Sequence, residues 1–498
     1  MKRFGKWLSL PLVLLLVILT GCEAVGGYDV NKALQKSLEV QSSESKQKVT
    51  IEVVPADNVS AVDKEIIDLI NSISLTVDHA KIKDASTMSL KGSIGFSGEK
   101  LPYHISLDTK GITVQLEGAK QPLYISLEDA YSEYLAFEPY DEQSQEFGVK
   151  AAGFLLKHMP NPSTISVKKV QEKVNEETLS LTHLHAEIRG DELVKLVKPL
   201  LTNVSKDEAG LKELIGAFYD AYYTVLSTQS GSDAFDAGPA SSKEFTVAAM
   251  YGVVQEALNE ILKDYDQQAA ALFEEMPELN TVLGKDTVLK TDLYFDGDLN
   301  TRKQNMELTI AIPQGAGVPI KTFTVRSESE MWNVGGTVAV DQVNVNAGKL
   351  DVTDEEMTPG QILRNFEPGS IIYKLLKDKM QITSKNVMIG YPGDYYEVIK
   401  KNGTSFVPLR YMSAELDAEI KWNEATKTIT IIDDITQAEI VLTIGSKQAK
   451  VAGKAAELSE PAFIHTDGKT YVPLRFIAEA LGAKVHAGGS DWITVTRD

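Results

Sequence analysis

The sequence FVPLRY at residues 406–411 returns as YVPLRF at residues 471–476, 65 residues later. In each copy the aromatic residue and the valine are typical of a β-strand. The proline can end that strand and start a helix, because its fixed φ suits the first helical turn and the N–H that it lacks is not needed there. The repeat therefore predicts two units, each with a strand followed by a short helix.

The similarity between the two units continues beyond this motif. Helices are predicted at 409–416 and 474–481, and Gly482 follows the second one at a position where glycine can adopt a positive φ. Asp417 takes the same position in the first unit and is a poorer choice. A hairpin of strands at 420–422 and 428–432 then follows in the first unit.

Arg410 and Arg475 lie in the first turn of the two predicted helices, where the helix dipole disfavours a positive charge. We expect each guanidinium to have a fixed carboxylate or carbonyl partner. Contact with a ligand is the alternative that the sequence leaves open.

Residues 383–498 resemble the copper amine oxidase N-terminal-like domain, also called the stalk domain, which is common in extracellular proteins of Gram-positive bacteria. The resemblance rests on the two VPLR motifs, on FIAEALGA at 476–483, on Pro461 and on short matches at 444–446 and 451–454. The sequence departs from the family at Ala487, where the second unit lacks the tryptophan that Trp422 supplies in the first. The resemblance implies a spacer or interaction module and no oxidase activity.

The family name suggests copper, but the residues of this region do not. Catalytic copper needs several histidine ligands. Residues 383–498 contain only His465 and His486, and they contain no cysteine. We therefore expect no bound metal and no other cofactor.

Length and composition limit the remaining possibilities. At roughly 100–200 residues per domain, a chain of 498 residues makes about three domains. Its formal net charge of -20 disfavours binding to nucleic acids or to anionic lipid headgroups through the overall electrostatic field. A single cysteine excludes intrachain disulfides.

The N-terminus has the pattern of a bacterial lipoprotein signal. Lys2, Arg3 and Lys6 precede an apolar run at 8–19, and the sequence LTGC follows at 19–22. This tetrapeptide resembles the lipobox, in which signal peptidase II cleaves before a cysteine that carries a diacylglyceryl group. The resemblance implies a signal peptide at 1–21, lipidation of Cys22, a tether at 22–46 and attachment to the extracytoplasmic face of the cell membrane. An uncleaved membrane anchor is the alternative.

The body at 47–380 has the predicted order strands, then helices, then strands. Alternating apolar residues predict strands at 73–77, 88–92, 103–107, 112–116, 123–127, 165–174, 178–188, 288–295, 305–312, 320–328 and 335–345. Helical periodicity is found at 30–40, 147–159, 192–226, 243–273 and 371–379. Because strands and helices are grouped separately, we expect an α+β fold with an antiparallel sheet that packs helices on one face.

The lipid anchor, early helix, long meander and later helices of residues 28–380 are similar at the level of pattern to the half-barrel lipoproteins of the LolA and LppX type. This resemblance implies a carrier that encloses a hydrophobic ligand between sheet and helices.

Three further groups of residues are candidates for binding sites. His183 and His185 have the spacing that places two side chains on one face of a strand, where they could share a metal, but no third ligand is placed nearby, and we interpret them as part of a solvated face. Asp296, Asp298, Asn300 and Glu307 match positions of a calcium loop, but Thr301 replaces the required glycine and we interpret the segment as a hairpin turn. The third group is four aromatic residues, which we interpret as core and, alternatively, as a binding surface: Tyr131, Tyr134, Phe137 and Tyr140.

No nucleophile elbow or phosphate-binding loop is present, so an enzyme is not expected. The prediction is a non-enzymatic, lipid-anchored surface protein of a Gram-positive bacterium. Its C-terminal module would act as a spacer or bind a cell-wall polymer or another surface protein. The alternative is an extracytoplasmic carrier of a hydrophobic ligand.

Overall fold

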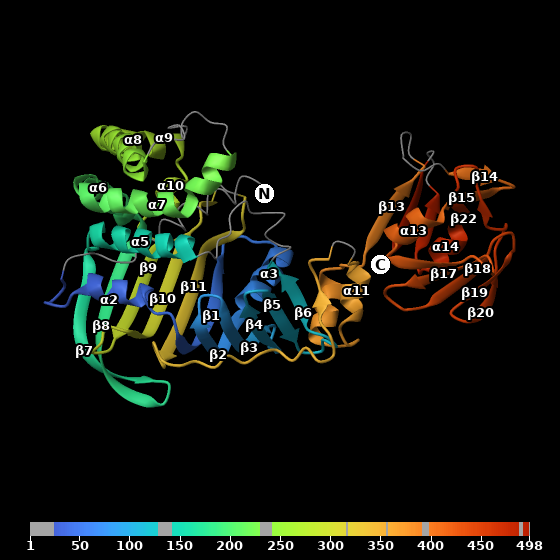
Figure 1. Ribbon diagram of the computed structural model, residues 1–498, viewed down its shortest axis with the longest axis horizontal. Coiled ribbons are helices and arrows are strands. Elements are labelled where there is room, and N and C mark those ends of the chain that lie inside the picture. Colours follow the sequence, from blue (N-terminus) through green and yellow to red (C-terminus); the bar gives the residue numbers. More distant parts are fainter. Residues whose placement is uncertain are drawn as a thin grey trace. The chain divides into compact units, whose positions relative to one another are not determined.

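The computed structural model describes residues 24–127, 142–229, 242–314, 317–354, 357–390, 398–487 and 492–497. The chain divides into two units, one formed by 1–114 and 126–343 and the other by 115–125 and 344–498, and each is described by itself (Figure 1). Both units combine helices with antiparallel sheets. The predicted α+β class is confirmed.

The sheet of the first unit has the strand order β5-β4-β3-β2-β1-β11-β10-β9-β8-β7. The predicted meander is confirmed in β2 to β5, whose short connections join neighbouring strands. The strands are β1 (Ser43–Pro55), β2 (Ser74–Asp84), β3 (Thr87–Phe96), β4 (Glu99–Asp108), β5 (Gly111–Leu116), β7 (Thr164–Val174), β8 (Glu177–Arg189), β9 (Val288–Phe295), β10 (Thr301–Ala311) and β11 (Ile320–Trp332).

Strand β1 joins two groups of strands that are far apart in the sequence. One edge of β1 pairs with β2, where Val49 lies opposite Leu75, and the other edge pairs with β11, where Ile51 lies opposite Val325. Both ladders are antiparallel. The early meander and the later strands therefore form a single continuous sheet.

Helices gather over one face of the β7–β11 half of this sheet (Figure 1). Ile188, Leu289 and Ile310 of the strands pack there with Leu193 and Leu196 in one buried cluster. The helices of the unit are α2 (Val30–Leu38), α3 (Ala61–Asn71), α5 (Glu142–His158), α6 (Gly190–Lys206), α7 (Glu208–Gln229), α8 (Lys243–Lys263), α9 (Tyr265–Glu275) and α10 (Leu279–Val282).

The predicted helices at 30–40 and 147–159 are confirmed as α2 and α5. Helix α2 is short, and its first turn is capped by Asp29, whose carboxylate accepts a hydrogen bond from the backbone N–H of Lys32 at 2.9 Å. The helical segment predicted with interruptions at 192–226 is formed by α6 and α7, which are divided at Asp207. The single helix predicted at 243–273 is instead two helices, α8 and α9, divided at Asp264. Helix α3 was not predicted.

The predicted strand at 335–345 is wrong. This segment has no ladder of its own, although Val338 and Val343 are buried. Its backbone hydrogen bonds go instead to side chains of β3 and β4. The N–H groups of Asp341 and Val343 donate to the hydroxyls of Ser89 and Ser106. Alternating burial can therefore arise in an extended segment that no neighbouring strand pairs with.

Asp207 joins three helices of the first unit. Its carboxylate accepts hydrogen bonds from Lys157 Nζ at 2.7 Å and from His158 Nε2 at 2.9 Å, both at the end of α5. Its other oxygen accepts from the backbone N–H of Gly210 in the first turn of α7 at 2.9 Å. The contacts with Lys157 and Gly210 are the main causes that lower the pKa of Asp207 from 3.8 to about 2.

We expect Asp207→Asn to lower the free energy of unfolding by about 1 kcal/mol at pH 7, a modest value because Lys157 is largely exposed. A lowered carboxyl pKa stabilises the fold above about pH 4, and this stabilisation is lost as the pH falls toward 2. The difference between wild type and variant should therefore disappear below about pH 2. Urea unfolding at several pH values measures it. The control Asp220→Asn removes an exposed carboxylate of α7 and should change stability by less than about 0.5 kcal/mol.

The second unit begins with β6 (Leu123–Ser126), which pairs in parallel with β12 (Leu350–Asp351). Short helices follow at α11 (Pro359–Arg364) and α12 (Ile371–Lys374), and α12 continues into the π-helix η2 (Leu375–Lys379). The predicted helix at 371–379 thus has two geometries. Helix α11, which was not predicted, begins with a capping box formed by Thr358 and Gln361.

The C-terminal part of this unit has three small sheets, with orders β13-β24-β23, β14-β15-β22-β21 and β16-β17-β18-β19-β20. Its helices confirm those predicted after each VPLR motif. The elements are β13 (Lys385–Ile389), β14 (Ile399–Lys401), β15 (Thr404–Pro408), α13 (Leu409–Glu415), β16 (Ala418–Asn423), β17 (Thr428–Asp433), β18 (Glu439–Thr443), β19 (Gln448–Val451), β20 (Lys454–Glu457), β21 (Phe463–Ile464), β22 (Thr470–Pro473), α14 (Leu474–Ala480), β23 (Lys484–Ala487) and β24 (Ile493–Arg497).

Candidate functional site

Two histidines and one aspartate meet on neighbouring strands of the first unit. His185 of β8 lies directly opposite Asp292 of β9, and His183 is two residues along β8 on the same face. His183 Nε2 is 2.6 Å and His185 Nδ1 is 2.8 Å from the same oxygen, Asp292 Oδ1. One carboxylate oxygen therefore accepts contacts from two imidazoles.

The surroundings of this cluster favour an ionised carboxylate. Burial by itself raises the pKa of Asp292, but the hydrogen bonds and charges of His185 and His183 outweigh it and lower the pKa below 3.8. The ring of His183 stacks on Tyr294, with centroids 4.4 Å apart and planes 8° from parallel. His183 is thus held in one orientation while its ring nitrogen points at Asp292.

The interpretation that no third ligand lies near His183 and His185 is wrong. Asp292 follows His185 by more than 100 residues, and it arrives only because β9 is the neighbour of β8. The sequence offers one signal for it, because Asp292 lies inside a predicted strand and aspartate is depleted in strands. Nothing in the sequence alone says which strand lies beside which.

The segment at 296–300 is a hairpin turn between β9 and β10, as interpreted. Asp296 Oδ1 accepts hydrogen bonds from the backbone N–H groups of Asp298 and Asn300 at 2.9 and 3.0 Å. Glu307 lies in β10 and instead contacts Arg326 and Lys290. These residues therefore do not converge on one point, as calcium ligands would.

The two C-terminal units associate through the repeated motif itself. Strands β15 and β22 pair antiparallel, so that Val407 lies opposite Val472, its equivalent in the other unit. The same symmetry relates β18, which pairs with β17, to β13, which pairs with β24. Strand β13 precedes both sequence repeats in the chain, but it pairs with β24 and so adds a strand to the sheet of the second repeat.

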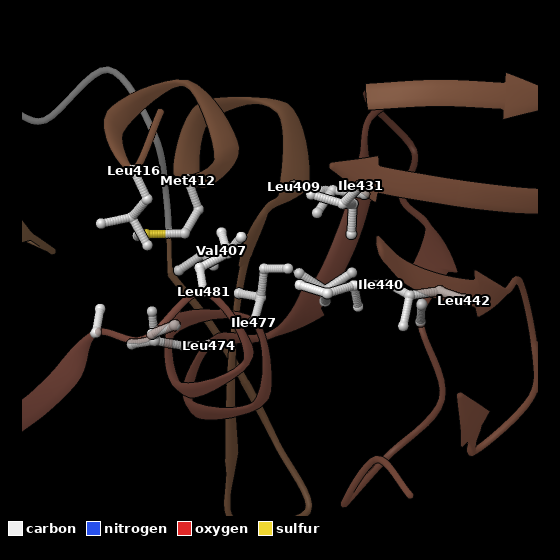
Figure 2. Packing of buried hydrophobic residues seen from close by; sticks show 14 of the residues in the cluster. Val407, Leu409, Met412, Leu416, Ile431, Ile440, Leu442, Leu474, Ile477 and Leu481 are labelled. Carbon is white, nitrogen blue, oxygen red and sulfur yellow. The ribbon is translucent and has the colours of Figure 1, made fainter. Parts of the chain in front are cut away.

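One hydrophobic core is shared by the two sequence repeats of the C-terminal domain. Met412 of α13, Ile477 of α14, Ile431 of β17 and the residues that directly follow the two helices, Leu416 and Leu481, are almost completely buried in it. Figure 2 shows these side chains pointing toward one another from both helices and from the strands. Neither unit could bury these side chains alone, so the duplication makes one domain.

Charged side chains are also buried in this part of the chain. Arg497 Nη2 is 2.6 Å from Asp433 Oδ1, and Arg497 Nη1 donates to the carbonyl of Leu416 at 2.6 Å. Asp417 has the positive φ of 51° expected for its position after the helix, and its carboxylate pairs with Lys385 Nζ at 2.9 Å. Gly482 has the corresponding φ of 75° in the second unit.

The C-terminal region is similar in sequence to a known domain family. Residues 394–495 match the copper amine oxidase N-terminal domain. This is a non-catalytic domain, and the match supports the resemblance stated for the C-terminal region. No curated protein matches the chain.

Among the described residues, the two histidines of the C-terminal domain are not part of a group of potential metal ligands. His465 packs its ring edge against Tyr471, with centroids 5.4 Å apart, and His486 Nε2 is 3.0 Å from Thr496 Oγ1. Within the described part of the chain, a group of three or more potential metal ligands forms only at His183, His185 and Asp292, outside this domain.

Both arginines of the repeated motif are exposed. Arg410 and Arg475 occupy the second position of α13 and α14, and among the described residues neither guanidinium contacts a carboxylate or a carbonyl. The expected structural partner is therefore not found there. Two positive side chains at equivalent positions remain accessible on the domain surface.

Three predictions from the sequence lie outside the described residues, and one of them is the signal peptide at 1–21. The other two are the lipidation site Cys22 and the aromatic group Tyr131, Tyr134, Phe137 and Tyr140. Of the helices that the structure describes, none combines the length and the apolar character needed to cross a membrane.

Proposed function

We propose that the chain is a non-enzymatic lipoprotein, attached through Cys22 to the extracytoplasmic face of a Gram-positive cell membrane. In this proposal the copper amine oxidase N-terminal domain is a spacer that presents an interaction surface to the cell envelope, with a cell-wall polymer or a surface protein as partner. The lipobox pattern at 19–22 supports the anchor.

The internally duplicated C-terminal domain is the observation that carries this proposal. It belongs to a non-catalytic family, and its two units share one buried core. Arg410 and Arg475 project from equivalent helices and are exposed. Exposed cations at repeated positions suit contact with an anionic polymer, because each guanidinium presents several hydrogen-bond donors to phosphate or carboxylate oxygens.

The anchor is tested by replacing its cysteine. We expect Cys22→Ser, expressed in a Gram-positive host, to remain an unprocessed precursor with no diacylglyceryl group, whereas the wild type is lipidated and sediments with the membrane. Fractionation and mass spectrometry of the N-terminal peptide measure this. A wild-type N-terminal peptide that carries no lipid contradicts the anchor.

The wall contact is tested by co-sedimentation of the full chain with purified sacculi. We expect the double variant Arg410→Gln/Arg475→Gln to bind about tenfold more weakly, since two charge-assisted contacts are lost. The matched control Lys450→Gln/Lys454→Gln removes the same charge from exposed positions of the same domain and should bind like the wild type. An equal loss of sacculus binding in both variants would mean that the contact depends on net charge and not on these two arginines. If the wild type does not bind sacculi, the domain acts only as a spacer.

A carrier of a hydrophobic ligand is the second candidate. Leu75 of β2 and Ile94 of β3 lie opposite each other, and they are 39% and 36% exposed. The ladder of paired residues places both on the face that carries the helices elsewhere in the sheet. Native mass spectrometry of the full chain with Cys22→Ser tests this candidate. An extractable lipid mass favours the carrier, and a bare protein that takes up no added lipid excludes it.

A further inference from the structure

The geometry points to a binding site for a divalent first-row transition metal at His183, His185 and Asp292, which we propose as a new feature of the first unit. The proposal is independent of the proposed function, because the cluster lies outside the C-terminal domain. The ligand atoms are His183 Nε2, His185 Nδ1 and one oxygen of Asp292, all within 4.8 Å of one another.

The donor set fits such an ion. Two imidazoles and one carboxylate are ligands that zinc and iron(II) accept with coordination positions left for water. At metal–ligand distances of about 2.0–2.2 Å in a tetrahedral site, neighbouring ligand atoms stand about 3.3–3.6 Å apart. The present distances from Asp292 Oδ1 are 2.6 and 2.8 Å. Small side-chain rotations, with no change of the backbone, are therefore enough to admit an ion.

The strands hold the ligands in place before an ion arrives. His185 and Asp292 are a directly opposite pair in an antiparallel ladder, and His183 is fixed by its stack on Tyr294. Sites on regular elements keep their geometry better than sites on loops. The side chains of His185 and Asp292 are 33% and 29% exposed, so an ion can enter from solvent.

Two polar side chains extend the same row of the sheet. Ser166 of β7 lies opposite His185, and Asn305 of β10 lies opposite Asp292. Because directly paired residues share one face, Ser166 and Asn305 lie beside the cluster on its two sides. Their oxygen atoms can accept hydrogen bonds from water bound to the metal. Such outer hydrogen bonds orient the ligands of open metal sites.

Other histidines of this unit provide matched controls. His79 Nε2 is 2.6 Å from Glu44, and His158 Nε2 is 2.9 Å from Asp207, but each of these carboxylates meets one imidazole. A simple histidine–carboxylate hydrogen bond is present in all three places. The cluster at Asp292 differs by its second histidine, and a metal should distinguish it from the other two.

The test is a titration of the full chain with Zn²⁺ alone. The protein carries no histidine tag, is kept in detergent, and has Cys22→Ser so that no thiolate competes. We expect one equivalent of Zn²⁺ to bind with a Kd of about 1 µM or tighter by calorimetry. Asp292→Asn and His185→Gln should weaken binding at least about 10–100-fold, whereas His79→Gln should leave it unchanged.

A second measurement keeps the result independent of variant folding. In ¹⁵N-histidine-labelled protein whose only substitution is Cys22→Ser, Zn²⁺ should shift the ring signals of two of the seven histidines, and these should be the signals missing when His183→Gln or His185→Gln is added. The proposal is overturned if no saturable binding occurs below about 100 µM, or if binding is equal in all variants. It is also overturned if the shifted signals belong to other histidines.

Discussion

Replacing Arg497 by methionine is expected to cost about 3–5 kcal/mol of unfolding free energy in the second unit. Arg497 is 5% exposed, and its guanidinium is held by Asp433 and by the carbonyl of Leu416. Methionine fills much of the volume but leaves Asp433 as a buried charge with no cation. Breaking a buried pair in this way is far more costly than removing an exposed one. Urea denaturation of the full chain followed by circular dichroism measures the change.

The matched control is Arg475→Met, which removes an exposed guanidinium from α14 and should change stability by less than about 0.5 kcal/mol. A further variant, Arg497→Met/Asp433→Leu, removes both charges and should recover part of the loss. Recovery cannot be complete, because Asp433 also accepts hydrogen bonds from Ile435 and Thr436 in the following turn. An Arg497→Met protein as stable as the wild type would show that the buried pair does not hold the two C-terminal sequence repeats together.

The ion pair of Asp433 and Arg497 shows which features of this domain the sequence could predict and which it could not. The repeated motif predicted two equivalent strand–helix units, and the structure confirms them because proline, the buried apolar positions and the positions after each helix act locally. Asp433 and Arg497 occupy equivalent positions of the two units. Their contact depends on how the units pack against each other, which local pattern does not encode.

Only part of the candidate metal site could be predicted from the sequence, for the same reason. The spacing of His183 and His185 placed two side chains on one face of a strand, and the strand itself is confirmed as β8. Asp292 was assigned to another strand, and only the order of β8 and β9 in the sheet brings it close. The pairing of β1 with β11 was likewise beyond prediction, because it joins residues more than 260 positions apart.

A single methyl group added to β3 is expected to disrupt the sheet of the first unit strongly. Gly92 is buried between β2 and β4, and a Cβ there would lie 1.9 Å from the carbonyl oxygen of Thr76 and 2.7 Å from the hydroxyl of Tyr103. The register of β2 against β3 shifts next to this position, between Val77 and His79. A strand glycine at such an irregularity lets two backbones approach closely.

Gly92→Ala is therefore expected to destabilise the sheet by about 3 kcal/mol or more, because backbone atoms must move to relieve the clash. Tyr103 has no room to yield without loss, since its hydroxyl donates to the same Thr76 oxygen at 3.0 Å. Gly95→Ala is the matched control on β3. Its Cβ would meet the hydroxyl of Ser74 at 2.5 Å, and that group can rotate away.

The comparison of these two variants separates close backbone approach from the general preference of strands for residues larger than glycine. Alanine restricts the unfolded chain equally at both positions, so that effect cancels in the difference. If urea unfolding shows Gly92→Ala to be no less stable than Gly95→Ala, β2 and β3 are farther apart than described. A large difference instead means that Gly92 is required for β2, β3 and β4 to pack as one continuous part of the sheet.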